Sequence, residues 1–392
     1  MEFPTPENVR WLSSVLEQTT GKTCDVQTVS TVEGSLVSGP HSDTAKIQLT
    51  FKDESQSLPR TLYWKKVIVK DLPHKASYKL YRDIYSYKTE TSFYQYFAQK
   101  LTERNLRVAK SYFVEENFVS HNLEQSHFLL LLEDLFAQGF TQPHVLYERK
   151  HVFSCLRFLA RLHSTFWNKT EQVQQLLWPE GSYWNLEKRP KDELTNLHIT
   201  WPQLCERFSN EFKNKNFRSL GSLLQKWSPW VTEQMAQIKD RTLIHGDFKS
   251  ANIFFRQDDN AAIQVATIDY QWSGAGAAIK DVMYLITSTH NIGLGVDNCK
   301  LEKEFLGVYC ALLKEYGVQY DVEDALYHFK LASLDHARII MAYFLNGATP
   351  ESLEKASSDP GEVGYCISVP HLVSLLEYYI MLFDEIENKF SQ

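Results

Sequence analysis

The first third of the chain has the hydrophobic pattern of a sheet bordered by helices. Residues 6–21 carry apolar positions in steps of three and four and stop at Gly21, which is typical of an amphipathic helix. Helical spacing returns at 86–101, and an apolar strand that ends in two acids is expected at 126–135. Strand-like runs rich in β-branched and aromatic residues lie between the two predicted helices, at 25–34, 45–51 and 61–70.

From about residue 144 the pattern becomes helical. Long helices are expected at 152–167, 301–317, 325–345 and 372–390. Short strands within 243–271 interrupt this half of the chain. A sheet followed by helices predicts an α+β protein, with a strand-rich N-terminal lobe and a helical C-terminal lobe that carries a small catalytic hairpin.

Composition narrows the class of protein. The chain has 392 residues, of which 43% are hydrophobic and 23% charged, and its net charge of −7 gives no reason to expect nucleic acid as a partner. Six scattered Cys with no CxxC indicate free thiols in a reducing compartment. The start of the chain lacks a signal pattern, and the longest apolar run, 128–132, is too short to span a bilayer. We therefore expect a cytoplasmic protein without membrane insertion.

The strongest chemical pattern is the stretch LIHGDFKSANIFF at 243–255. Asp247 and Asn252 lie five residues apart on a tight loop, and Asp269 ends the next strand. Carboxylate and amide oxygens of this kind suit Mg²⁺, which usually shares its ligands with phosphate. Phosphoryl transfer requires such ligands, an acid near the attacking hydroxyl and cations on the phosphates.

The spacing H-x-D-x-x-x-x-N is the catalytic-loop signature of protein kinases, with Gly246 in place of the usual Arg. On that template Asp247 accepts the hydroxyl proton, while Asn252 and Asp269 hold Mg²⁺. Lys249 is close enough in sequence to reach the γ-phosphate. A surface hairpin with capping acids is the alternative for any one of these residues, but the complete set favours catalysis.

Here the chain resembles the aminoglycoside phosphotransferase/choline kinase superfamily, and within it the ecdysteroid-kinase-like branch. The resemblance is densest in HGDFKSANIFF and TIDYQWSGAGAAIKDVMYL, and shorter pieces such as LYWKKV, SYKTETSFY and LLLEDL agree in order. It implies a protein-kinase-like bilobal fold that uses MgATP to phosphorylate a hydroxyl of a small molecule. The nucleotide-binding lobe would be 1–133, and the catalytic and substrate-binding lobe 134–392.

The resemblance also implies roles for single residues of the loop. Asp247 matches the catalytic base of the family, and Asn252 and Asp269 match its magnesium ligands. His245 matches the loop His, which would brace the metal-binding strand rather than act as a base.

The N-terminal lobe should supply a Lys for the phosphates and a helix Glu that holds this Lys. Glu90 is the helix candidate. Lys65, Lys66 and Lys70 share one strand, where alternation puts Lys65 on one face and the other two on the opposite face. The match of LYWK to the family favours Lys65, and solvated edge lysines are the alternative for all three.

Two further segments are candidates for nucleotide contact. Gly34, Ser35 and Gly39 lie in a polar turn between strands, where a loop would cover the phosphates, although any hairpin also favours Gly. The resemblance makes the segment around Glu133 and Leu135 a hinge whose backbone contacts the adenine. Its acids equally suit a solvated strand end.

Several polar residues are expected to be structural. Asp281 is predicted to be the N-cap of a helix, and His163 a hydrogen-bonded residue of the core. Asp335 and Arg338 interrupt an apolar helix together with His336. A substrate-pocket lining and an internal ion pair are the two interpretations, and the ion pair is favoured.

The acceptor is expected to be a small molecule rather than a protein. Only about a dozen residues separate Asp269 from Asp281, without the A-P-E that ends a protein kinase's activation segment. The resemblance suggests a steroid or another bulky alcohol. A catalytically silent nucleotide-binding scaffold is the alternative function, and the oligomeric state is expected to be a monomer or weak homodimer. Aromatic residues suit a ring-bearing substrate or plain packing: Trp178, Tyr183, Trp184 and Trp201.

Overall fold

The computed structural model describes residues 8–38, 43–53, 57–69, 77–142, 147–258, 262–290, 293–358 and 368–391. The chain forms two compact units. The first consists of Met1–Thr141 and Ala266–Gln271, and the second of Gln142–Val265 and Trp272–Gln392. The predicted lobes, 1–133 and 134–392, stay a prediction, and residues 266–271 are part of the first compact unit.

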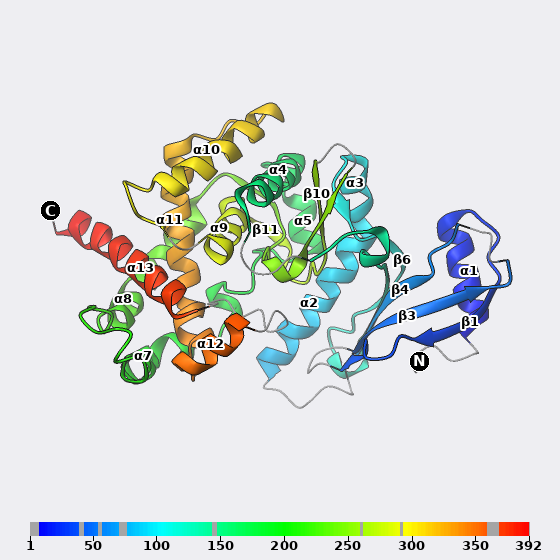
Figure 1. The fold of residues 1–392 in the computed structure, drawn as a ribbon, viewed down its shortest axis with the longest axis horizontal. Coiled ribbons are helices and arrows are strands. Elements are labelled where there is room, and N and C mark those ends of the chain that lie inside the picture. The colour runs from blue at the N-terminus through cyan, green and yellow to red at the C-terminus, as the bar shows by residue number, and fades with distance from the viewer. Residues whose placement is uncertain are drawn as a thin grey trace. The chain divides into compact units, whose positions relative to one another are not determined.

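An antiparallel sheet is the centre of the first unit (Figure 1). Its strands run in the order β1 (Val26–Thr31), β3 (Asp43–Phe51), β4 (Thr61–Ile68), β7 (His127–Glu133) and β6 (Ser111–Asn117), and the short β2 (Val37–Ser38) pairs with β3. β4 therefore lies between two partners over residues 62–66. The parallel pairing of β5 (Arg107–Val108) with Ala266 and Thr267 at the end of β10 completes this unit.

The two faces of this sheet are covered by different helices because β4 alternates its side chains. Trp64 faces α1 (Asn8–Thr20), whose Trp11 packs edge-on against it with ring centroids 5.7 Å apart. Val67 joins a cluster on the other face with Ile84 of α2 (Ser77–Tyr96). The next helix along the chain is α3 (Ala98–Glu103). Lys65 lies two residues before Val67 on β4, so its side chain is on the same face of the sheet and points toward α2.

Helices dominate the second unit. The longer ones are α4 (Arg149–Phe166), α7 (Leu197–Arg207), α8 (Leu220–Gln237), α9 (Ile279–Thr289), α10 (Lys300–Glu315), α11 (Val322–Ile339) and α13 (Val369–Phe390). The shorter ones are α5 (Glu171–Leu176), α6 (Lys191–Thr195) and α12 (Pro350–Ser358). α10 packs on α4, and α11 packs on both α8 and α9. α11 continues into a π-helical turn, η6 (Ile340–Phe344).

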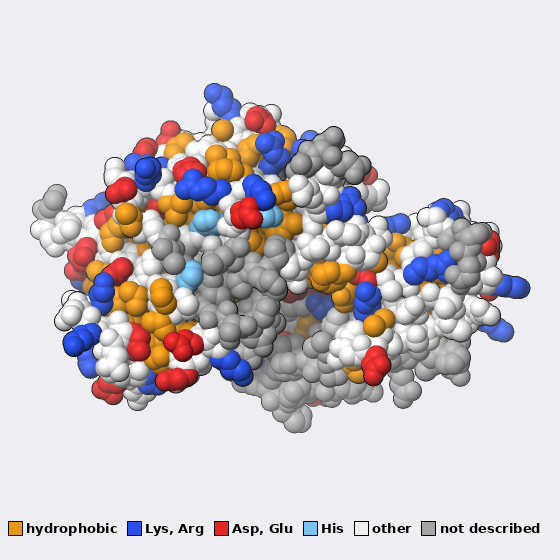
Figure 2. Space-filling view, in the orientation of Figure 1, with side chains coloured by type: hydrophobic (Ala, Val, Ile, Leu, Met, Phe, Trp, Pro, Cys, Tyr) orange, Lys and Arg blue, Asp and Glu red, His pale blue; other side chains and the backbone are white. Residues whose placement is uncertain are grey.

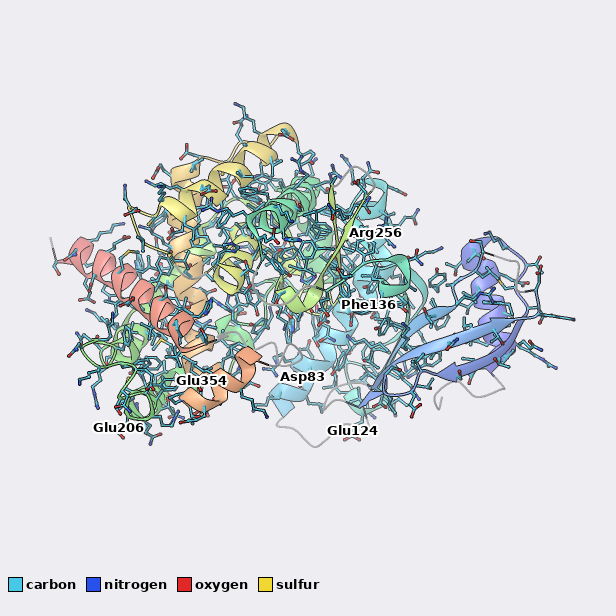
Figure 3. The ribbon with its side chains drawn as sticks, viewed as in Figure 1. Asp83, Glu124, Phe136, Glu206, Arg256 and Glu354 are labelled. Carbon is cyan, nitrogen blue, oxygen red and sulfur yellow. The ribbon has the colours of Figure 1, made fainter. Side chains whose placement is uncertain are left out.

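Two small strand pairs interrupt these helices. β8 (Arg241–Ile244) pairs antiparallel with β11 (Gly274–Ala277), and β9 (Ile253–Gln257) lies beside β10 (Ile263–Thr267). Arg256 of β9, labelled in Figure 3, donates to Gln264 of β10 at 2.7 Å. The loop between β8 and β9 carries the H-x-D-x-x-x-x-N motif.

The predicted α+β class is confirmed, with some elements misplaced. The helix expected at 86–101 begins earlier, at Ser77, and is interrupted at Phe97. β6 was not predicted, because every residue along it is half-buried and no alternation marks it. β11 was missed because its sequence, GAGA, has almost no side chains. An added Cβ at Gly274 would overlap the Trp178 carbonyl oxygen, which explains why Gly occupies this position.

The surface and the thiols agree with an ordinary globular composition. On the face drawn in Figure 2, acidic and basic side chains are interspersed rather than gathered by sign. Within the described ranges, five cysteines are free and buried: Cys24, Cys155, Cys205, Cys299 and Cys310. No helix in the part of the chain that the structure describes has the length and hydropathy needed to cross a membrane.

Candidate active site

In the first unit, Lys65 is held by Glu90. Lys65 Nζ lies 2.7 Å from Glu90 Oε2, and both side chains are largely buried. Their elements dictate this contact, because β4 directs Lys65 toward α2 and the helix presents Glu90 to the sheet. Lys66, the neighbouring candidate, lies opposite Asp43 in the β3–β4 ladder. Lys70 lies outside the described residues.

A second carboxylate joins the pair. Asp269 Oδ1 lies 3.6 Å from Lys65 Nζ. Burial by itself lowers the pKa of Lys65, but the carboxylates of Glu90 and Asp269 outweigh it and hold this pKa above its ordinary value. Lys65 therefore keeps its charge at neutral pH, as a phosphate-binding cation requires.

Asp269 is held in a backbone conformation that few residues adopt. Its φ is +64°, in the left-handed region that costs non-glycine residues free energy. The neighbouring residues fix it. Tyr270 stacks on Phe93 of α2 with ring centroids 3.5 Å apart, and Gln271 donates to Glu90 at 3.4 Å. Asp269 Oδ1 is buried and accepts no hydrogen bond from the residues that the structure describes, so it retains capacity for a ligand.

In the predicted phosphate-covering turn, the hydroxyl of Ser35 is hydrogen-bonded to neighbouring backbone groups. Gly34 has φ +73°, as a tight turn requires. The hydroxyl of Ser35 donates to Val32 O at 2.6 Å and accepts the N–H of Lys46 at 3.1 Å. Gly39 lies outside the described residues. Phosphate contact by this turn stays a prediction.

In the predicted adenine hinge, the backbone groups named below are also hydrogen-bonded to nearby residues of the first unit. The backbone N–H of Glu133 donates to Lys110 O at 2.8 Å, and its carboxylate pairs with Arg107 at 2.6 Å. The carbonyl of Leu135 accepts the N–H groups of Gln138 and Phe140 at 3.1 and 3.0 Å. An adenine contact here therefore stays a prediction, and it would use other backbone groups of this segment.

In the second unit, the motif brings Asp247, Asn252 and Lys249 together. Asn252 Nδ2 donates to the Asp247 carbonyl at 2.8 Å and to its carboxylate Oδ2 at 3.0 Å. Lys249 Nζ lies 3.0 Å from the same Oδ2. Asp247 is buried, and its other oxygen, Oδ1, accepts no hydrogen bond from any described residue. One carboxylate oxygen is thus fixed and the other is left for a reactant.

Gly246 explains why this loop departs from the protein-kinase signature. Its φ is +79°, and an added Cβ would overlap the carbonyl oxygen of Trp272 and lie 2.8 Å from the N–H nitrogen of Ser182. No side chain fits at this position, so Arg cannot occupy it. The glycine therefore lets the loop pack directly against Trp272.

Asp281 anchors the loop, and the prediction that it caps a helix was wrong. The N-cap of α9 is Ala278, and Asp281 lies inside the first turn. Its fully buried carboxylate accepts the N–H of His245 at 2.7 Å and of Gly246 at 2.9 Å, and contacts His163 Nε2 at 3.2 Å. The apolar residues around Asp281 in the sequence do not predict this role, because the role depends on where β8 ends in the fold.

Two other structural expectations are confirmed. His163 is completely buried and also bonds the Tyr309 hydroxyl at 2.6 Å, so it belongs to the core. Asp335 pairs with Arg338 at 3.4 Å. His245 is buried as well, and its Nδ1 accepts the N–H of Asp247 at 3.3 Å. This contact orients the loop at the residue where chemistry is expected.

One comparison with known proteins shows a family. The pattern of the ecdysteroid kinase-like family matches residues 41–317. Among solved structures, the chain is similar to the GDP complex of wild-type aminoglycoside 2'-phosphotransferase-IIIa, with 10% identity and a TM-score of 0.44 over 95% of this chain and 99% of that chain. The chain is also similar to amicoumacin kinase hAmiN in complex with AMP-PNP, Ca²⁺ and Ami, with 13% identity and a TM-score of 0.45 over 97% of this chain and 94% of that chain. Similarity to choline kinase from Cryptosporidium parvum Iowa II extends over 98% of this chain and 94% of that chain, with 10% identity and a TM-score of 0.45. A search of curated proteins found no match.

Proposed function

The chain belongs to the ecdysteroid kinase-like family, and from this premise we propose that it transfers the γ-phosphate of MgATP to a hydroxyl group of a small molecule. The first unit would bind the nucleotide, and the second would bind the acceptor and carry the base. The family name points to a steroid-like or another bulky alcohol as the acceptor.

The geometry of Asp247 supports this function most directly. Asn252 and Lys249 both hold Oδ2, which leaves the buried Oδ1 to accept a proton. In the reaction the acceptor oxygen bonds to the γ-phosphorus, the bond to the bridging oxygen breaks, and ADP leaves. Asp247 takes the proton of the acceptor hydroxyl.

Positive charge for the phosphates would come from each unit separately. Lys65, kept charged by Glu90 and Asp269, would bind the nucleotide's phosphates. Lys249 would exchange its contact with Asp247 for the transferred phosphoryl group. Cations in these positions offset the negative charge of the phosphates.

Each unit, taken separately, offers an oxygen that suits a magnesium ion, which usually shares its ligands with phosphate. Asp269 Oδ1 accepts no hydrogen bond from described residues, and Asn252 has its amide nitrogen in use, so its oxygen is left for a cation. Across the described ranges, no group of three or more His, Cys, Asp or Glu is placed to hold a metal. The ion would therefore depend on nucleotide oxygens as well. When bound, it would neutralise charge on the phosphates.

The proposal is tested by transfer of labelled γ-phosphate from MgATP into a fractionated small-molecule extract, with Asp247→Ala as control. We expect a labelled product that falls by about 10³-fold or more in the variant, because the base is lost. ATP binding without any transfer would reject the kinase and support the silent scaffold. Transfer that is unchanged in Asp247→Ala would reject this residue as the base.

A further inference from the structure

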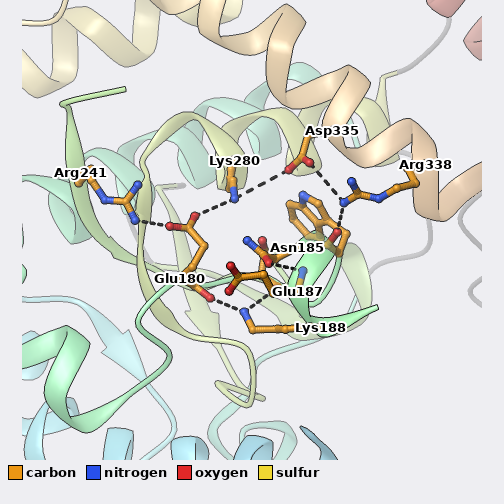
Figure 4. A network of polar contacts seen from close by, with 10 residues as sticks. Glu180, Asn185, Glu187, Lys188, Arg241, Lys280, Asp335 and Arg338 are labelled. Atoms are coloured by element: carbon orange, nitrogen blue, oxygen red, sulfur yellow. Dashed lines mark hydrogen bonds and ion pairs between the residues drawn. The ribbon is translucent and has the colours of Figure 1, made fainter. Parts of the chain in front are cut away.

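A network of ion pairs inside the second unit contains more cations than carboxylates (Figure 4). Glu180 pairs with Arg241 and, at 2.9 Å, with Lys280. Lys280 also lies 3.8 Å from Asp335, which pairs with Arg338 at 3.4 Å. Three cations thus share two carboxylates, which leaves one positive charge without a partner of opposite sign.

This excess charge lies where water has little access. Lys280 is 3% and Arg338 2% exposed. Burial lowers the pKa of Arg338 below its ordinary value, although the Asp335 carboxylate acts in the opposite direction. The neighbouring Arg189 and Glu193 pair with each other at 2.9 Å, so they leave the net charge unchanged. A buried charge that is not matched destabilises the fold, and a counter-charge would stabilise it.

Lys188 adds to the positive side of the network. Its Nζ donates to the carbonyl of Glu180 and, at 2.8 Å, to that of Ser182. Burial and repulsion from Lys280 lower the pKa of Lys188 to about 7, so it carries part of a positive charge at neutral pH. Glu187 is the nearest further acid, but it is exposed, and water screens its charge.

Two N–H donors at the Arg338 end of the network lack a hydrogen-bond acceptor among the described residues. They are Arg338 Nε and the indole Nε1 of Trp184, and both atoms are buried. The two side chains are neighbours, because the guanidinium of Arg338 donates to the carbonyl of Trp184. Buried donors of these kinds are nearly always hydrogen-bonded, so this pair indicates a ligand that accepts hydrogen bonds.

The surroundings define the kind of ligand. N–H donors beside an excess of positive charge bind anions and do not ligate metal ions. Trp184 is 0% and Asp335 5% exposed, so the ligand must be small. A single excess charge suits a monovalent ion. A water molecule would satisfy the two donors but would leave the charge unmatched.

We propose that the second unit binds one monatomic, monovalent anion of the halide class, such as chloride, at Arg338 Nε and Trp184 Nε1. The ion would accept both N–H groups and neutralise the excess charge of the network. It would thereby tie α11, which carries Arg338, to the segment 180–185. Ser182 of this segment donates its N–H to Trp272 O at 2.9 Å, so the ion would stabilise a part of the unit that packs against the catalytic loop.

Thermal unfolding of the full chain tests this site, at a constant total salt of about 0.15 M in which chloride replaces gluconate. Gluconate has the same charge as chloride but is too large for a buried site. We expect Tm to rise by about 2 °C or more with chloride, because an ion that binds only the folded chain stabilises it. Bromide, which is also monatomic and monovalent, should act like chloride.

Trp184→Phe removes one of the two donors and keeps an aromatic ring, so it should lose most of the rise in Tm. Trp201→Phe is the matched control. Trp201 is 1% exposed, but its Nε1 already donates to the carbonyl of Phe217 at 2.7 Å. This control should keep the full rise with chloride, even where its Tm is lower in both salts.

Equal Tm values in chloride and gluconate would overturn the anion and leave water as the ligand. An equal rise in Trp184→Phe and the unaltered chain would place the ion elsewhere. If Trp184→Phe does not fold, chloride NMR line widths of the unaltered chain decide. Broadening that saturates and is displaced by bromide would keep the site, and broadening that bromide leaves unchanged would reject it. No ATP or Mg²⁺ is present, so the outcome is independent of the proposed kinase activity.

Discussion

Lys65 and Lys66 are neighbours on β4 with opposite surroundings. Lys65 meets Glu90 and Asp269, while Lys66 lies opposite Asp43. We expect Lys65→Ala to raise the apparent KM for ATP by about 10- to 100-fold, because a charged contact to phosphate contributes about 1.5–3 kcal/mol. Lys66→Ala is the matched control and should leave this KM unchanged. Steady-state kinetics with varied ATP measures both, and the opposite ranking would move the role to Lys66.

Single residues of the site differ in how far the sequence predicts their contacts. The Lys65–Glu90 pair followed from the family resemblance, since strand alternation separated Lys65 from Lys66 and Lys70 but did not choose between the two faces. The role of Asp281 did not follow, because its carboxylate binds backbone N–H groups of His245 and Gly246, which lie 36 and 35 residues earlier. No periodicity encodes such a contact. It depends on how β8 and α9 meet after folding.

Among the elements, the loop between β8 and β9 is the most tightly constrained. Gly246→Ala must place a Cβ against the carbonyl of Trp272 in a left-handed backbone conformation. We expect a loss of unfolding free energy above about 3 kcal/mol, from overpacking added to backbone strain. Gly317→Ala is the control, since Gly317 has φ +82° with no atom near its added Cβ, and it should cost about 1 kcal/mol. Urea unfolding measures both, and equal losses would show that backbone strain alone matters.

Asp281 is predicted to act on catalysis by positioning this loop. Asp281→Asn replaces one acceptor oxygen with an amide that faces a backbone N–H, so the loop shifts. We expect kcat to fall by about tenfold or more, since a misplaced base loses most of its effect. The KM for ATP should change little.

Asp321→Asn provides the matched control for Asp281. Asp321 also accepts two backbone N–H groups, those of Glu323 and Asp324, but as the exposed N-cap of α11. Asn caps helices as well as Asp does, so this variant should keep both kcat and stability. Equal kcat values for the two variants would remove the positioning role.

Elements with strong periodicity were predictable, and the others were not. The long amphipathic helices α10 and α13 coincide with the expected ranges within a few residues, whereas α11 ends six residues before the expected end at 345. The π-helical turn at Ile340–Phe344 has no such signature, because its apolar letters fit an ordinary helix equally well. The exposure of Tyr343 and Phe344 could therefore not be predicted from the sequence.

For the whole molecule, acid stability should depend on His336. It is fully buried beside the rings of Trp184 and Tyr284, with centroids 4.7 and 4.9 Å away. Burial, assisted by Arg338, lowers its pKa from 6.5 to about 3. The unfolded chain therefore binds a proton below pH 6.5 that the folded chain refuses. The resulting stability is present above pH 6.5 and is lost as the pH falls toward 3.

The expected size is at most about 1.4 kcal/mol of unfolding free energy per pH unit within this window. His336→Gln removes the titrating ring, so its unfolding free energy should fall less steeply between pH 6 and pH 4. Urea unfolding at several pH values compares the two slopes. Identical slopes would show that His336 does not control acid stability.

The return of 266–271 to the first unit also has a consequence for biosynthesis. When the ribosome has added residue 141, it has yet to make Asp269 and Tyr270, which contact Lys65 and Phe93. At about 5–20 residues per second, these partners follow after roughly ten seconds. During that interval the nascent N-terminal unit has a sheet but lacks the hexapeptide that packs on α2. A nascent chain would therefore acquire its complete first unit only after about half of the second had been translated.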